Sequence, residues 1–148
     1  MELRTRINEE MKAAMRAQDK ARLGTIRLLL SAIKQIEVDT RVTLGDAEII
    51  VVIEKMIKQR RESVKQYEAG NRPELAAIET AEITVLQDYL PQALSDGELQ
   101  ELINAAVLDT AAAGVKDMGK VMNWLKPKIQ GRAEMGTVSA LIKARLNS

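Results

Sequence analysis

The sequence predicts an all-α protein in two parts: an N-terminal bundle of about four long helices over residues 1–92, and a small three-helix domain over residues 93–148. Composition is the first reason. Aromatic residues make up only 2% of the 148 residues, with no Phe, while hydrophobic residues make up 46%. The core must therefore consist of Leu, Ile, Val, Ala and Met, and Leu, Ala and Met are strong helix formers. Sheet proteins use more aromatic residues and Thr.

The second reason is that apolar residues recur at helical spacing along the first forty residues. Residues 2–18 form one predicted helix, and a second runs from Asp19, its expected N-cap, to about Asp39. The apolar positions are Leu3, Ile7, Met11, Ala14 and Met15, then Leu23, Ile26, Leu30 and Ile33. Arg27, Ser31 and Lys34 share another face of the second helix. We interpret that face as solvated, with an extended binding surface as the alternative.

The next two predicted helices carry charges inside their apolar stripes. One covers 46–69 and ends at Gly70, an expected left-handed cap, and the other begins at Pro73. Their apolar positions are Ile49, Ile53, Met56, Val64 and Tyr67, then Leu75, Ile78, Val85, Leu86 and Tyr89. Arg60 falls inside the first stripe, Glu82 inside the second and Glu79 at its edge. Because an unpaired buried charge is costly, we expect Arg60 to form a structural ion pair with Glu79 or Glu82.

Three shorter helices follow Leu90-Pro91, where proline ends the fourth helix. Ser95 and Glu98 have the spacing of a capping box and start a helix that we expect to reach Gly114. The next starts at Asp117 and closes at Gly131, with Pro127 kinking it or tightening its last turn. The last begins at about Thr137.

The sequence contains neither His nor Cys. This excludes disulfides and thiolate metal sites, and it removes the commonest general base. Glu79 and Glu82 have the i, i+3 spacing of paired ligands, but a di-metal carboxylate bundle normally adds His. We therefore predict no catalytic residue, no metal and no cofactor.

The segment 114–120 matches most of a phosphate-binding loop. Val121 follows it where magnesium binding needs Ser or Thr, and a helix precedes it where a strand is expected. We interpret Gly114 as the end of one helix and Asp117 as the start of the next, with Gly119 permitting close helix packing.

The first twenty residues are charged and amphipathic, unlike a secretory signal. The longest apolar run, Ile49 to Ile53, is too short to cross a membrane. The sequence thus predicts a soluble, cytoplasmic protein.

Charge is segregated along the chain. Residues 71–115 contain one Arg and eight Asp/Glu, whereas residues 116–148 contain seven Lys/Arg and two Asp/Glu. Four of these cations, Lys120, Lys126, Lys128 and Arg132, cluster around the sixth helix and are candidates for binding a phosphate backbone. The alternative is a solvated polar face. Trp124 lies off the apolar stripe, where it could stack on a base, fill a partner's pocket or cover the Pro127 kink.

Several motifs together resemble the GatB/YqeY family along essentially the full length. They are Arg27, Lys58-Gln59-Arg60 with Ser63 and Tyr67, Gly70-Asn71-Arg72, Glu79 and Glu82, Tyr89-Leu90-Pro91 with Leu94-Ser95, 117–122, and Gly131-Arg132-Ala133. Glu134 departs from the Asp that is usual in the family.

The resemblance implies an all-helical protein whose residues from about Ser95 are similar to the tail of the B subunit of glutamine-dependent tRNA amidotransferase. In that enzyme a separate cradle domain performs the ATP- and magnesium-dependent chemistry, and the tail helps to recognise tRNA. By motif position, Lys120, Lys126, Lys128 and Arg132 would face tRNA. The cradle is absent from this sequence.

Three functions follow as hypotheses. The first is a tRNA- or RNA-binding accessory module linked to translation or transamidation. The second is a component of a carbon–nitrogen ligase that uses glutamine as amido donor and has an amidotransferase or other translation protein as its partner. The third is a protein–protein adaptor that uses Trp124 and the outer faces of the second and third helices.

Overall fold

The computed structural model describes residues 2–147, and those residues form helices and no strands. The order of elements is α1 (Leu3–Arg16), α2 (Lys20–Thr40), α3 (Asp46–Ala69), α4 (Pro73–Gln87), α5 (Asp96–Asp109), a 3₁₀ turn η1 (Val115–Asp117), α6 (Met118–Ile129) and α7 (Met135–Asn147). They belong to two compact units, Met1–Leu90 and Pro91–Ser148. The predicted all-α class, with four helices followed by three, is confirmed.

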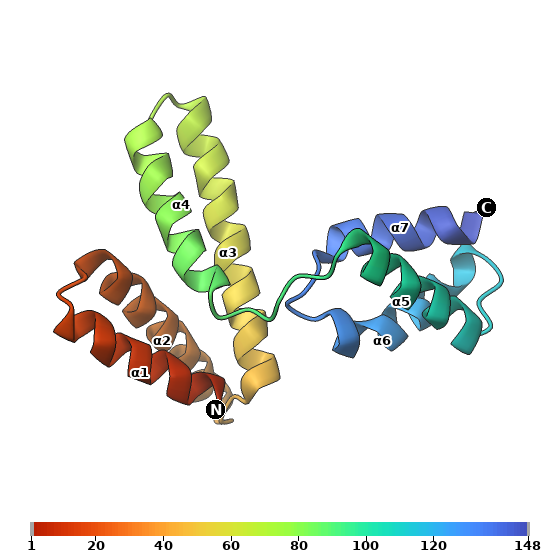
Figure 1. The fold of residues 1–148 in the computed structure, drawn as a ribbon, viewed down its shortest axis with the longest axis horizontal. Helices are drawn as coiled ribbons and strands as arrows, with labels where there is room; N and C mark the ends of the chain where they lie inside the picture. Colours follow the sequence, from red (N-terminus) through yellow and green to blue (C-terminus); the bar gives the residue numbers. More distant parts are fainter. Residues whose placement is uncertain (1, 148) are drawn as a thin grey trace. The chain divides into compact units, whose positions relative to one another are not determined.

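The first unit consists of two helical hairpins, α1 with α2 and α3 with α4, as Figure 1 shows. The contact between α3 and α4 is the most extensive in the chain. Buried residues of α3 lie between Ile49 and Ile57, although the helix continues to Ala69. The last turns of α3 and the first turns of α4 therefore lie away from α1 and α2 and pack mainly on each other (Figure 1).

The core of this unit is aliphatic, as the composition requires. Its fully buried side chains are Ile7, Ile26, Leu29, Ile33, Ile49, Ile53 and Leu86. Met15, which we expected on the inner face of α1, is 49% exposed. It lies in the last turn of α1, next to the reversal that leads into α2, so no helix covers it.

Only the C-terminal part of α4 and the residue Tyr89 after it match the predicted stripe. Leu86 and Tyr89 are buried as expected, but Leu75 is 36% and Ile78 56% exposed. Ala76 and Ile83 are buried in their place. The first turns of α4 pack on α3 through the side that carries Ala76 and lie away from α1 and α2, so Leu75 and Ile78 are left exposed there.

The end of α4 is held against α1 and α2 by polar contacts. The Arg6 guanidinium donates to the Asp88 carbonyl at 2.7 Å and lies 5.0 Å from the centre of the Tyr89 ring. Arg22 Nη1 lies 3.6 Å from Asp88 Oδ2. Tyr89 is 3% exposed, and this burial, together with the nearby Glu10 carboxylate, raises its pKa. The last residues of the first unit are therefore fixed to its core.

The second unit packs α5, α6 and α7 around a separate core. Its buried residues are Leu99, Ile103, Ala106, Val107, Val121, Leu125, Ile129, Val138 and Ile142. The stripes predicted for α5 and α6 face this core. Helix α5 ends at Asp109, earlier than the expected Gly114, because Ala111 takes a left-handed conformation with φ 54°.

The N-terminal caps predicted from the sequence are present at α2 and α5. The Asp19 side chain accepts from Arg22 N at 3.1 Å, and Ser95 and Glu98 form the predicted capping box at 3.1 Å in both directions. Several helix ends differ from expectation. Gly70 has φ −84°, and the left-handed residue after α3 is Asn71, with φ 56°. Gln18 and Arg41 are also left-handed, both with φ 57°. Gly131 has φ 76° and follows α6 as expected.

Between residues 2 and 147 the structure has no helix that combines the length and apolar character needed to cross a membrane.

Candidate nucleic-acid interface on α6

The five candidate residues in the second unit do not form one patch, because the winding of α6 divides them. Lys120, Trp124 and Lys128 stand at i, i+4 and i+8, which places them in one row along a flank of the helix. Val121, Leu125 and Ile129 are fully buried and define the core-facing side next to that row. The row is called the α6 row below. Its two lysines are exposed.

Trp124, the middle residue of the α6 row, contacts both the end of α5 and the Lys128 side chain. Its indole N–H donates to Asp109 Oδ2 at 2.6 Å, which ties α6 to the end of α5. The Lys128 ammonium lies 3.8 Å from the centre of the indole ring. The ring is partly buried and packs against the core of the unit. Trp124 is thus a support for Lys128, because its N–H is already paired and one ring face is covered by a cation.

Lys126 lies elsewhere on α6. A step of two residues turns an α-helix by about 200°, so Lys126 points away from Lys128, and its side chain is exposed. Lys120 begins the α6 row near an acid: its ammonium is 3.8 Å from Asp117 Oδ1, and the lysine side chain remains 67% exposed. Both cations remain accessible to an anionic ligand.

Asp117 stabilises the turn between α5 and α6. Its carboxylate accepts from the Ala113 backbone N–H at 2.9 Å. That hydrogen bond lowers the pKa of Asp117, assisted by the nearby Lys120 ammonium and opposed by desolvation. The Asp117 carboxylate therefore closes the turn before α6, and the helix begins after Asp117 as we interpreted it from the sequence. The other two parts of that interpretation are wrong: α5 ends at Asp109 and not at Gly114, and Gly119 is exposed, with no atom within 4 Å of an added Cβ, so it serves no close helix packing.

Arg132 has a different role from the lysines. It lies between α6 and α7, and its Nε donates to the Gln92 carbonyl at 2.9 Å. The Leu94 backbone N–H donates to the Arg132 carbonyl at 2.9 Å. Arg132 is half-buried and fastens the segment before α5 to the turn after α6. Its substitution would disturb this attachment as well as remove a charge.

In the first unit, Arg60 lies opposite Glu82. Arg60 Nε is 2.6 Å from Glu82 Oε2, with side-chain exposures of 14% and 23%. Arg60 also donates to the Met56 carbonyl at 3.4 Å. Glu79 is partly buried, and within residues 2–147 it forms no ion pair. The Arg60–Glu82 pair joins α3 to α4 at the place where the helices leave the main core.

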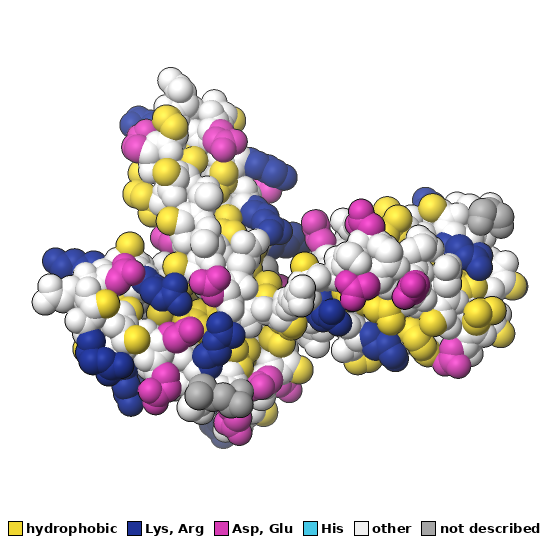
Figure 2. Space-filling model, viewed as in Figure 1, with side chains coloured by type: hydrophobic (Ala, Val, Ile, Leu, Met, Phe, Trp, Pro, Cys, Tyr) yellow, Lys and Arg dark blue, Asp and Glu magenta, His cyan; other side chains and the backbone are white. Residues whose placement is uncertain are grey.

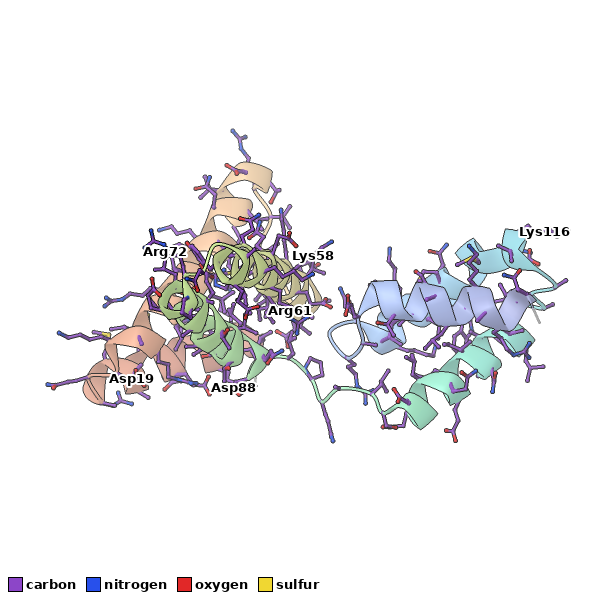
Figure 3. All side chains as sticks on the ribbon, turned by 90° about the horizontal axis from the view of Figure 1, so that it is seen from above. Asp19, Lys58, Arg61, Arg72, Asp88 and Lys116 are labelled. Carbon is purple, nitrogen blue, oxygen red and sulfur yellow. The ribbon has the colours of Figure 1, made fainter. Side chains whose placement is uncertain are left out.

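Other exposed cations lie on the first unit. Lys58, Arg61 and Lys65 are exposed on α3, and Figure 3 shows Lys58 and Arg61 on the side of that helix away from α4. Figure 2 shows that cationic and anionic side chains alternate over much of the visible surface of this unit. Such alternation gives a weaker field than a row of one sign.

Sequence reasoning missed two partners of the candidate site, Asp109 and Gln92. Asp109 is the last residue of α5 and meets Trp124 across 15 residues of sequence. Gln92 contributes only a backbone carbonyl to Arg132. No local pattern predicts either contact, since both depend on how α5 and α6 pack.

The described part of the chain contains no group of three or more acidic side chains that could hold a metal ion. The groups of the α6 row that a ligand can reach are the ammonium groups of Lys120 and Lys128, the second of which lies over the Trp124 ring.

Comparison with known proteins identifies relatives. The model of the family described as Yqey-like protein matches residues 4–146. A protein of Lachancea thermotolerans named altered inheritance of mitochondria protein 41, mitochondrial, is 29% identical over 143 residues, which cover 92% of this chain and 76% of the relative. A protein of the same name from Pyrenophora tritici-repentis is 29% identical and covers 86% and 71%.

A third relative with this name, from Clavispora lusitaniae, is 37% identical over 95 residues, which cover 62% of this chain and 55% of the relative. The match to the family model overlaps all seven α-helices of the structure and reaches into both units. This chain therefore belongs to the YqeY-like protein family.

Proposed function

We propose that the protein is an RNA-binding accessory module that docks on tRNA through α6 of its second unit. The observation that carries the proposal is the α6 row, in which two exposed lysines lie on either side of a tryptophan along one flank of the helix. Lysine ammonium groups bind phosphate oxygens and release the counterions of a nucleic-acid backbone. The α6 row is therefore suited to bind a phosphate backbone.

The spacing of the α6 row suits such a ligand. Eight residues of α-helix separate the two lysine Cα atoms by about 12 Å, and long flexible side chains can adjust their ammonium groups by several ångströms. The contact of Lys128 with the indole ring restricts its side chain before any ligand arrives. Less side-chain entropy is then lost on binding.

The proposal concerns binding, because exposed lysine ammonium groups are charged and act as ligands for phosphate oxygens. The choice of tRNA rests on resemblance: residues from about Ser95 are similar to the tRNA-recognising tail of the B subunit of glutamine-dependent tRNA amidotransferase. On that basis, transamidation is the process in which we place the protein. Addition of the protein to that amidotransferase should then change the rate of tRNA amidation.

The test is tRNA binding by the purified protein at low and at physiological salt. We expect binding that weakens as salt rises, and we expect Lys120→Ala/Lys128→Ala to lower both the affinity and the dependence on salt, by about one unit of slope for each lysine. Trp124→Leu should weaken binding without removing a charge, since Lys128 loses its support. Lys12→Ala/Lys143→Ala removes two exposed lysines outside α6 and serves as the matched control.

Lys126→Ala measures how far the contact extends around α6, and Arg132 is left intact because of its backbone contact. Equal affinity of the wild-type protein and the Lys120/Lys128 variant would show that the α6 row does not bind the ligand. Absence of tRNA binding by the wild-type protein at low salt would refute the proposed function.

A further inference from the structure

Helix α4 has a surface that no described residue of the first unit covers. Leu75 and Ile78 are 36% and 56% exposed, and Ala81 on the same side is also exposed. A helix that is apolar on more than one side is normally enclosed by other elements. Hydrophobic and acidic side chains lie next to one another on the surface over this helix (Figure 2).

The charged residues of α4 itself have one sign, although Arg72 precedes the helix as its N-cap. Residues 73–87 contain three Glu and no Lys or Arg. Glu74, Ile78 and Glu82 stand at i, i+4 and i+8, so the two carboxylates lie on either side of Ile78 along one row. Glu82 is partly neutralised by Arg60, whereas Glu74 is exposed and forms no ion pair among the described residues. The row Glu74–Ile78–Glu82, with Leu75 and Ala81, is called the acidic face below.

Helix α2 has an exposed surface of the opposite sign. Leu28 is 51% and Val38 63% exposed, and Arg27 and Lys34 lie beside them, also exposed. Neither cation forms an ion pair among residues 2–147. Arg27 and Lys34 are seven residues apart, a separation of about 10 Å along the helix. These four residues, with Ser31, are called the basic face below.

Gly24 lies next to the basic face on α2, and no packing contact among the described residues requires glycine there. It stands inside α2, where glycine destabilises a helix relative to alanine. A Cβ atom added to Gly24 would meet no atom within 4 Å. Nothing inside the molecule therefore requires a residue without a side chain, but a helix that approaches from outside would gain close contact there.

We propose that the basic face of α2 in one copy of the protein docks on the acidic face of α4 in a second copy. Exposed aliphatic side chains would be buried on both sides of this contact, and Arg27 and Lys34 would lie opposite the carboxylates of α4. Each copy carries both faces, so a closed twofold dimer contains the contact twice. This inference is independent of the proposed function, since α6 takes no part in it.

The same observations indicate that the dimer is weak. The two faces together offer few large apolar side chains, and specific interfaces of small area belong to weak or transient complexes. We therefore expect a monomer at low concentration and a dimer at high concentration. Part of the attraction is between exposed charges, so salt should weaken the dimer.

The experiment is sedimentation equilibrium of the full-length protein from micromolar to near-millimolar concentration, with two reversed-charge variants. Arg27→Glu/Lys34→Glu makes the basic face acidic. Glu74→Lys/Ala81→Lys makes the acidic face basic, again with charges seven residues apart, and it leaves the Arg60–Glu82 pair intact. Circular dichroism checks that each variant is folded, and Lys12→Glu/Lys143→Glu is the control for charge reversal elsewhere.

Each reversed-charge variant alone should remain monomeric at concentrations where the wild-type protein and the control dimerise. An equimolar mixture of the two variants should dimerise again, because every contact in the mixed pair joins unlike charges. A wild-type protein that is still monomeric at the highest concentration would overturn the proposal. The basic and acidic faces would then be candidates for binding a different protein. Dimerisation that neither variant reduces would overturn it too, since the contact would then lie elsewhere.

Discussion

Two carboxylates in the second unit link its stability to pH. The Ser95 backbone and side chain lower the pKa of Glu98 below 4.5, and the Ala113 N–H lowers the pKa of Asp117 below 3.8. A carboxylate whose pKa is depressed by folding stabilises the folded state above its unfolded pKa, and this contribution is lost as the pH falls through the folded value. Glu98 is exposed, so water screens its contribution, whereas the Asp117 side chain is only 14% exposed.

We predict that the second unit loses stability as the pH falls from about 4.5 downwards, through the titration of these two groups. Glu98→Gln should remove part of that loss, because its side chain no longer titrates. Side-chain carbonyl chemical shifts followed by NMR through an acid titration would measure both pKa values directly. Titration of Glu98 and Asp117 at ordinary values would contradict the contacts seen at the helix starts.

The Arg60–Glu82 pair is the main polar contact between α3 and α4, and we predict that Glu82→Leu alone costs about 1–3 kcal/mol of unfolding free energy. The reason is that it leaves the largely buried Arg60 guanidinium without its acceptor. Arg60→Met combined with Glu82→Leu should recover most of that loss, since no charge then remains unpaired. Urea unfolding of the two single variants and the double variant gives the coupling energy. Additive losses would show that the two side chains do not interact.

At the level of elements, the sequence was a good guide wherever one residue determines the structure locally. Asp19 and Ser95 each cap a helix through a hydrogen bond from the amide three residues away, and Pro73 starts a helix through its own φ angle. Such effects act within one turn of chain. The number and order of helices could therefore be predicted from the sequence.

The sequence predicts the structure less well where contacts between distant elements determine which side chains are buried. In α4, periodicity favoured Leu75 and Ile78 as buried, but the packing of α3 on Ala76 leaves them exposed. In and just after α6, the sequence places four cations close together. The helical turn separates Lys126 from Lys128, and Arg132, which follows the helix, donates to a backbone carbonyl. Amphipathic patterns predict which side of a helix is apolar, and packing determines along what length that side is covered.

The segment between the two units is anchored at both ends. Asp88 and Tyr89 are held by Arg6, and Gln92 and Leu94 by Arg132. We predict that Arg132→Ala increases limited proteolysis near residues 92–94, because both the guanidinium contact and the fixed geometry of the turn are weakened. Arg132→Lys should not restore protection, since lysine cannot reproduce a planar Nε–H donor. Fragment mapping by mass spectrometry locates the cleavage, and unchanged resistance would show that Arg132 does not hold this segment.

At the scale of the whole molecule, each unit has its own hydrophobic core and no buried residue of one belongs to the other's cluster among the described residues. Residues 91–148 make a unit of under 60 residues, for which burial on folding is marginal. We predict that this fragment alone is helical by circular dichroism but unfolds at a lower urea concentration than the full chain. A fragment that is wholly unfolded would show that the first unit is required for its fold.

The left-handed residues after three helices have a practical consequence for protein engineering. Gln18, Arg41 and Ala111 occupy a backbone region in which a side chain costs energy and glycine does not. The natural chain thus retains strain at places that belong neither to a core nor to the α6 row. Glycine at each of them would recover roughly 1 kcal/mol, so a more heat-resistant form of this protein could be made without altering any surface to which we assign a function.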